Sequence, residues 1–135
     1  EPALFRRHDR QAYRNRGHQK AKLDPLGLAK REEIPDLDLS AHGLTKSDLD
    51  TVFNTGNLEI GKSEATLAEM IEAMESIYCG SIGVEYMHIV DTKEKRWIQQ
   101  RLESARGKFN YTNDQKKGLS LKPLLRNLPH NRYPL

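Results

Sequence analysis

The stretch TLAEMIEAMESIYCG, residues 66–80, is the feature that most constrains how this chain folds. Its apolar side chains recur at intervals of three and four residues, which places them on one face of an α-helix. Thr66 and Glu69 have the spacing of a capping box at the start of that helix, and Gly80 favours its end. The sequence therefore predicts one well-defined amphipathic helix, with this apolar face: Leu67, Met70, Ile71, Met74, Ile77 and Tyr78.

The remaining sequence offers little apolar material to pack against this helix. Hydrophobic residues make up 36% of the 135 residues, charged residues make up 30%, and the mean hydropathy is −0.78. Such a chain fits one domain with a small core, to which a partner surface could add further burial. The predicted fold class is mainly α: a small helical module with one short strand or extended segment, long irregular loops and a tail. The predicted division is a helical module at 1–109 and a divergent extended tail at 110–135.

Three further segments have recognisable patterns. A weakly amphipathic helix is expected over residues 2–18, where Gly17 would end it, and a short helix over 45–56, between Thr45 and Gly56. From Asp91 the chain is expected to be helical again, because Asp91 and Glu94 have a second capping-box spacing. Alternation over residues 84–90 fits a strand or an extended loop.

The first two dozen residues are strongly basic, although the net charge of the whole chain is only +3. Contact with nucleic acid or an acidic lipid surface is one interpretation of this pattern. The favoured interpretation is a solvated helix face or a contact with an acidic neighbour, since few aromatic residues are interleaved for stacking on bases. No apolar run is long enough to predict a transmembrane segment. The basic residues are Arg6, Arg7, Arg10, Arg14, Arg16, Lys20 and Lys22.

The chain has few candidates for chemistry. Cys79 is the only cysteine, and its expected place at the carbonyl end of a helix disfavours a reactive thiolate, so a buried structural thiol is predicted. The five histidines are scattered, without the spacing of a zinc motif. Alternating aspartates near residues 36 and 48 lack the glycine and glutamate of a calcium loop. The sequence therefore assigns no catalytic, cofactor-binding or metal-binding residue.

Four blocks of the sequence resemble successive blocks of the 2-oxoglutarate dehydrogenase E1 component in order and spacing. They are YRNRGHQKAKLDPLGL (13–28), HGLTKSDLDTVFNTG (42–56), TLAEMIEAMESIYCGSIGVEYMHI (66–89) and EKRWIQQRLES (94–104). The resemblance implies a helical region that precedes the catalytic body of a thiamine diphosphate- and magnesium-dependent enzyme. That family's cofactor motifs lie further along, so none is transferred to residues of this chain. After about Lys117 the sequence departs from the family pattern, which indicates a fragment, a truncated or frameshifted paralogue, or a descendant with a new tail.

Two functions follow from this resemblance. The favoured hypothesis is a non-catalytic E1-like module, an accessory or structural interaction subunit of a larger mitochondrial (matrix-side) assembly, with the bacterial cytoplasm as the alternative location. The alternative is an N-terminal piece of an active E1 enzyme of the tricarboxylic acid cycle, which decarboxylates 2-oxoglutarate and transfers a succinyl group to a lipoyl partner. For the loop leucines and Trp97, the competing interpretation is packing in the chain's own core. The predicted interface residues are Leu23, Leu26, Leu28, Trp97, Leu121, Leu124, Leu125 and Tyr133.

Overall fold

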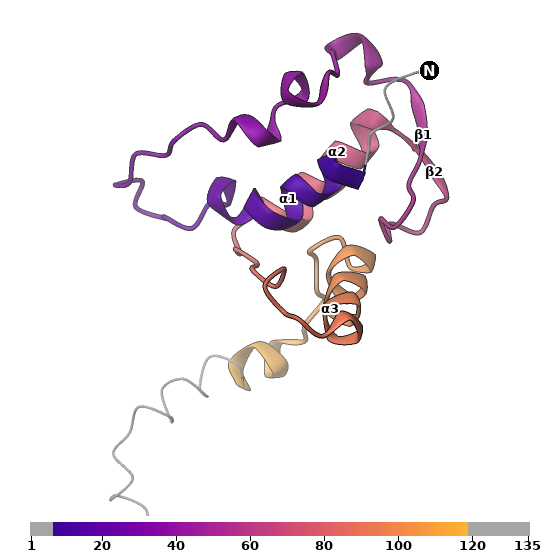
Figure 1. The fold of residues 1–135 in the computed structure, drawn as a ribbon. Coiled ribbons are helices and arrows are strands. Elements are labelled where there is room, and N and C mark those ends of the chain that lie inside the picture. The colour runs from indigo at the N-terminus through magenta and orange to yellow at the C-terminus, as the bar shows by residue number, and fades with distance from the viewer. Residues whose placement is uncertain (1–6, 119–135) are drawn as a thin grey trace, which may run out of the picture.

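A computed structural model describes residues 7–118, and it is mainly α-helical, as predicted. Helices α1 and α2 lie together, a β-hairpin stands at one end of them, and α3 lies below (Figure 1). No helix in this part of the chain is long and apolar enough to cross a membrane. The elements are α1 (Arg7–Lys20), the 3-10 helices η1 (Pro35–Leu37), η2 (Leu39–His42) and η3 (Lys46–Asp48), strands β1 (Val52–Asn54) and β2 (Glu64–Thr66), α2 (Leu67–Tyr78) and α3 (Thr92–Ser104).

Helix α2 forms the centre of the core and follows the prediction closely. The Thr66 hydroxyl accepts a hydrogen bond from the Glu69 backbone N–H at 3.2 Å, and the Glu69 carboxylate accepts one from Thr66 N–H at 3.1 Å. This capping box satisfies two backbone donors that the first helical turn would otherwise leave unpaired. Met70, Met74 and Tyr78 are fully buried, so one face of α2 is covered along its whole length.

Helix α1 continues past the glycine that was expected to end it. The helix runs to Lys20, and Gly17 lies within it against α2. A Cβ atom at Gly17 would be only 2.6 Å from the Cβ of Tyr78, so a larger residue would not fit. The prediction that Gly17 terminates the helix is therefore wrong, because this glycine allows two helix backbones to approach closely.

The segment after α1 contains no α-helix at 45–56, which corrects a second prediction. Thr45 does stand at the start of a helix, and the Asp48 carboxylate accepts a hydrogen bond from its N–H at 2.8 Å, but the helix is a short 3-10 helix. The chain then becomes β1, where Phe53 is buried and its two neighbours are exposed. That alternation has the period of a strand. The spacing of Leu49, Val52 and Phe53 in the sequence was also compatible with one face of a helix, so the sequence did not separate the two.

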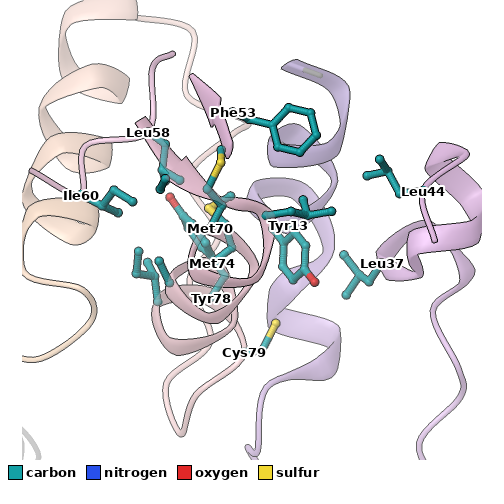
Figure 2. Close-up of a cluster of buried hydrophobic side chains, with 14 of the residues drawn as sticks. Tyr13, Leu37, Leu44, Phe53, Leu58, Ile60, Met70, Met74, Tyr78 and Cys79 are labelled. Carbon is teal, nitrogen blue, oxygen red and sulfur yellow. The ribbon is translucent and has the colours of Figure 1, made fainter. Parts of the chain in front are cut away.

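Strand β1 pairs with β2 as an antiparallel hairpin in which Phe53 lies opposite Ala65. Both side chains face the core, and β2 leads directly into α2. Figure 2 shows the result: Tyr13 of α1 and the α2 methionines lie at the centre, with Phe53 above them. Leu37 and Leu44 from the 3-10 segment cover one side, and Leu58 and Ile60 from the hairpin loop cover the other.

The final described segment agrees with one of two alternatives at residues 84–90 and differs from expectation at the start of the tail. Residues 84–90 form an irregular loop and not a strand, so the extended-loop alternative is confirmed. Helix α3 begins as predicted, with the Asp91 carboxylate accepting a hydrogen bond from Glu94 N–H at 2.8 Å. Residues 113–118, the described start of the expected extended tail, are helical, and Thr112 and Gln115 exchange capping hydrogen bonds there. The division at 109/110 stays a prediction.

Candidate functional site

The candidate nucleophile, Cys79, lies in an environment that disfavours a reactive thiolate. It is a buried free thiol at the C-cap of α2, where its N–H donates to the carbonyl of Glu75 at 2.9 Å. Burial raises the pKa of the Cys79 thiol to about 11, so the reactive thiolate is scarce at neutral pH. Within residues 7–118 there is also no group of three or more His, Cys, Asp or Glu side chains placed to hold a metal ion.

The most elaborate polar arrangement is a buried ion pair between Arg14 of α1 and Glu103 of α3. The Arg14 Nη2 atom lies 2.7 Å from Glu103 Oε1, and both side chains are almost wholly buried, with 1% and 0% exposure. Burial by itself would lower the pKa of Arg14, but the charge and hydrogen bond of Glu103 raise it above its ordinary value. The guanidinium is therefore held charged inside the protein, next to its counterion.

Neighbouring groups satisfy the remaining hydrogen-bonding capacity of this pair. The Tyr78 hydroxyl donates to Glu103 Oε1 at 2.8 Å and lies 2.9 Å from the Tyr86 hydroxyl. The second Glu103 oxygen accepts the backbone N–H of Glu59 at 3.0 Å. Arg14 also donates to the backbone carbonyl of Asn57 at 3.1 Å. The network joins α1, α2, α3 and the hairpin loop. Because its groups are buried and hydrogen-bonded to one another, a structural role fits them better than a catalytic one.

The basic face predicted for α1 is largely occupied by contacts within the chain. Arg14 is buried in the pair with Glu103, and Arg10 is also buried and donates to Asn57 Oδ1 at 3.2 Å. Arg16 pairs with Asp36, and Lys20 pairs with Glu75. Contact with an acidic neighbour, one part of the favoured interpretation, therefore describes Arg14, Arg16 and Lys20. Arg6 lies outside the described residues.

The predicted interface residues of the first loop are exposed. Leu23 is 54% exposed, Leu26 is 78% exposed and Leu28 is 81% exposed. The competing interpretation, that these leucines pack into the chain's own core, is wrong for Leu26 and Leu28. Leu23 packs against Gly83, where a Cβ atom would be 3.0 Å from the Leu23 Cδ1.

The turn that carries Leu26 and Leu28 is fixed by the side chain of Asp24. The Asp24 carboxylate accepts hydrogen bonds from the backbone N–H groups of Ala29 at 2.7 Å and of Leu26 and Gly27 at 3.1 Å each. These bonds, the one from Ala29 foremost, lower the pKa of Asp24. Gly27 has a φ of +65°, a conformation that favours glycine. The turn residues of DPLG therefore define this conformation locally.

Trp97 is exposed as well, which contradicts the interpretation that it packs in the core. Its side chain lies on the outer face of α3, 61% exposed, and the Arg101 guanidinium carbon is 5.6 Å from the ring centroid. Ile98 and Leu102 provide the face of α3 that packs on the core. The other predicted interface residues, Leu121, Leu124, Leu125 and Tyr133, lie outside the described residues.

Sequence reasoning missed two features of these sites. Ile82 is 68% exposed in the connection after α2, next to Gly83, against which Leu23 packs. The sequence signal that could have indicated it is an apolar residue in a short turn between two glycines, Gly80 and Gly83. The Arg14–Glu103 pair joins residues 89 positions apart, and neither the periodicity of α1 nor that of α3 indicates such a partner.

Curated relatives of this chain are 2-oxoglutarate dehydrogenase E1 components. The chain is 52% identical over 109 residues to that of Azotobacter vinelandii, 44% identical over 106 residues to that of Cupriavidus necator, and 38% identical over 107 residues to that of Haemophilus influenzae. The matches cover 81%, 78% and 78% of this chain, and 12%, 11% and 11% of the respective relatives. No protein-family model matches the chain. This chain is therefore homologous, over about 80% of its length, to the N-terminal region of 2-oxoglutarate dehydrogenase E1 components.

Proposed function

We propose that this chain is the N-terminal structural module of a 2-oxoglutarate dehydrogenase E1 enzyme. The observation that carries the proposal is the 52% identity over 109 residues to a relative of which the chain spans only 12%. The proposed activity of the whole enzyme is the thiamine diphosphate-dependent decarboxylation of 2-oxoglutarate, followed by succinyl transfer to a lipoyl partner. The comparisons support this reading better than the accessory subunit favoured from the sequence.

The geometry of residues 7–118 supports a structural role for this module within the enzyme. Thiamine diphosphate and Mg²⁺, when bound, would supply the carbanion chemistry of the decarboxylation. Residues 7–118 do not fit the Mg²⁺ ion of that cofactor pair, since they hold no group of three or more His, Cys, Asp or Glu side chains placed to bind a metal ion. We therefore assign no step of the reaction to them, and assign to them the support of the enzyme's architecture.

The bacterial cytoplasm is the proposed location. The relatives described above come from bacteria, and a mitochondrial assembly has no support among them. This proposal reverses the preference that the sequence alone suggested. It applies to the whole E1 enzyme that we propose.

The mass and activity of the native polypeptide test the proposed function. The protein is captured from its source cells with an antibody against residues 42–56, its intact mass is measured, and carbon dioxide release from 2-oxoglutarate is assayed with thiamine diphosphate and Mg²⁺. We expect a polypeptide several times heavier than 15.5 kDa whose activity requires the cofactor. A 15.5 kDa protein without this activity, bound to a larger assembly, would overturn the proposal in favour of the accessory subunit.

A further inference from the structure

The loop at residues 22–31 combines an apolar tip with a fixed conformation. Leu26 and Leu28 are largely exposed at this tip. The loop projects from the body of the molecule at the left of Figure 1. Exposed leucines in a disordered segment would be unremarkable, but a protein that orders them in water retains an apolar surface suited to a partner.

Both ends of the loop are tied to the helices. At its start, Lys22 N–H donates to the carbonyl of Gly80 at 2.7 Å, and Leu23 packs on Gly83. Near its end, Arg31 Nη1 donates to the carbonyl of Lys20 at 2.9 Å. Together with the Asp24 hydrogen bonds, these contacts order the loop before any partner binds. A surface ordered in advance loses less conformational entropy on docking.

The charges beside the tip indicate what borders its partner surface. Lys22 and Lys30 stand at the two sides of the leucines, and both are exposed. Neither forms an ion pair with another described residue, whereas Lys20 pairs with Glu75. An apolar hollow with carboxylates at its rim would complement this arrangement of two leucines between two cations.

We propose that this leucine loop docks into an apolar, acid-rimmed hollow on the remaining part of the same E1 polypeptide. The inference rests on the proposed function, because the matched segment makes up only 12% and 11% of two of the relatives, which extend far beyond it. A second copy of the chain or a separate subunit is a different occupant, and the experiment below distinguishes them.

Site-specific photo-crosslinking in the native full-length polypeptide tests this proposal. Leu26→p-benzoylphenylalanine places the crosslinker at the loop tip, and Val90→p-benzoylphenylalanine, at a residue 93% exposed, is the matched control. We expect the Leu26 variant to give an intramolecular crosslink to residues outside this 135-residue segment, rich in apolar and acidic side chains. A crosslink between two copies, or to another subunit, would overturn the inference.

Thiol labelling of the same polypeptide provides a second readout. For the Leu26→Cys variant, the rate of thiol labelling in the native protein is divided by the rate in urea. The same ratio is measured for the Val90→Cys variant, and the two ratios are compared. We expect the Leu26 site to be protected at least about tenfold more strongly. Equal labelling of the two sites in a protein that has the expected mass and activity would overturn the docking inference alone. A 15.5 kDa product without activity would overturn the proposed function, and the inference with it.

Discussion

At the scale of single residues, the buried carboxylate of Glu103 is a point at which hydrogen bonds from three parts of the chain converge. It accepts from Arg14, from the Tyr78 hydroxyl and from the backbone N–H of Glu59. A charge taken out of water is tolerated only when its partners are in place, so the pair contributes little to stability when intact and costs much when broken. Its removal is therefore a sharp test of the structure.

The substitution Glu103→Gln keeps the side-chain shape and leaves the Arg14 guanidinium buried without its counterion. We expect the free energy of unfolding to fall by about 3–5 kcal/mol, measured by urea denaturation followed by circular dichroism. The matched control is Glu75→Gln, which removes the partly exposed partner of Lys20 and should cost less than about 1 kcal/mol. Equal losses in the two variants would contradict the burial of the Arg14–Glu103 pair.

The thiol of Cys79 provides a prediction about pH. Because burial raises its pKa to about 11 from the ordinary 9.0, alkylation by iodoacetamide at pH 8 should be much slower in the folded protein than in urea. The unfolded chain ionises first, so this group's contribution to stability is complete below pH 9 and is lost as the pH rises through about 11. Equal alkylation rates in folded and unfolded protein would show that the thiol is accessible and unshifted.

At the scale of secondary-structure elements, helix α1 packs closely against α2 at Gly17. Alanine favours a helix over glycine by about 1 kcal/mol, so Gly17→Ala would stabilise an isolated α1. Here the new methyl group meets Tyr78, and we expect a net loss of about 1–3 kcal/mol in unfolding free energy. The control Asn15→Ala, at an exposed site on the same helix, should not destabilise the protein. A stabilised Gly17→Ala variant would contradict the close packing of these helices.

The outer face of α3 is tested by the fluorescence of its single tryptophan. Trp97 is 61% exposed, so its emission maximum in the folded chain should lie close to that of the chain in urea. A clear blue shift on folding, measured at concentrations low enough to exclude association, would place the ring in a core. The measurement separates the interface prediction for Trp97 from the core interpretation that the structure contradicts.

Helix α2 could be predicted from the sequence because its cap, periodicity and end are all local signals. The same local reasoning failed at Gly17 and Phe53, where the deciding partner is distant in sequence. The close approach of Tyr78 leaves no room for a side chain at residue 17. Phe53 lies in a strand because it pairs with Ala65 on the neighbouring strand. The loop leucines were predicted as interface candidates from composition, but their exposure and the hydrogen bonds that fix their loop required the fold.

At the scale of the whole molecule, contacts between residues distant in sequence bring the helices and the hairpin together around one small core. Arg14 and Glu103 are 89 residues apart, and their pairing joins the first helix to the last long one. The leucine loop leaves this core and is fixed only at its base. The molecule therefore has a packed interior that determines its own stability and an ordered apolar projection that does not contribute to it.

This separation predicts different outcomes for chemically identical substitutions in the 135-residue chain. Leu26→Ala and Leu28→Ala remove exposed side chains, so each should change the free energy of unfolding by no more than about 0.5 kcal/mol. Leu37→Ala removes a side chain that is only 8% exposed and contacts the core, and should cost about 2–5 kcal/mol. Urea denaturation of the three variants measures the difference. Comparable losses at Leu28 and Leu37 would show that the loop packs on the chain itself, and would leave no free apolar surface for a partner.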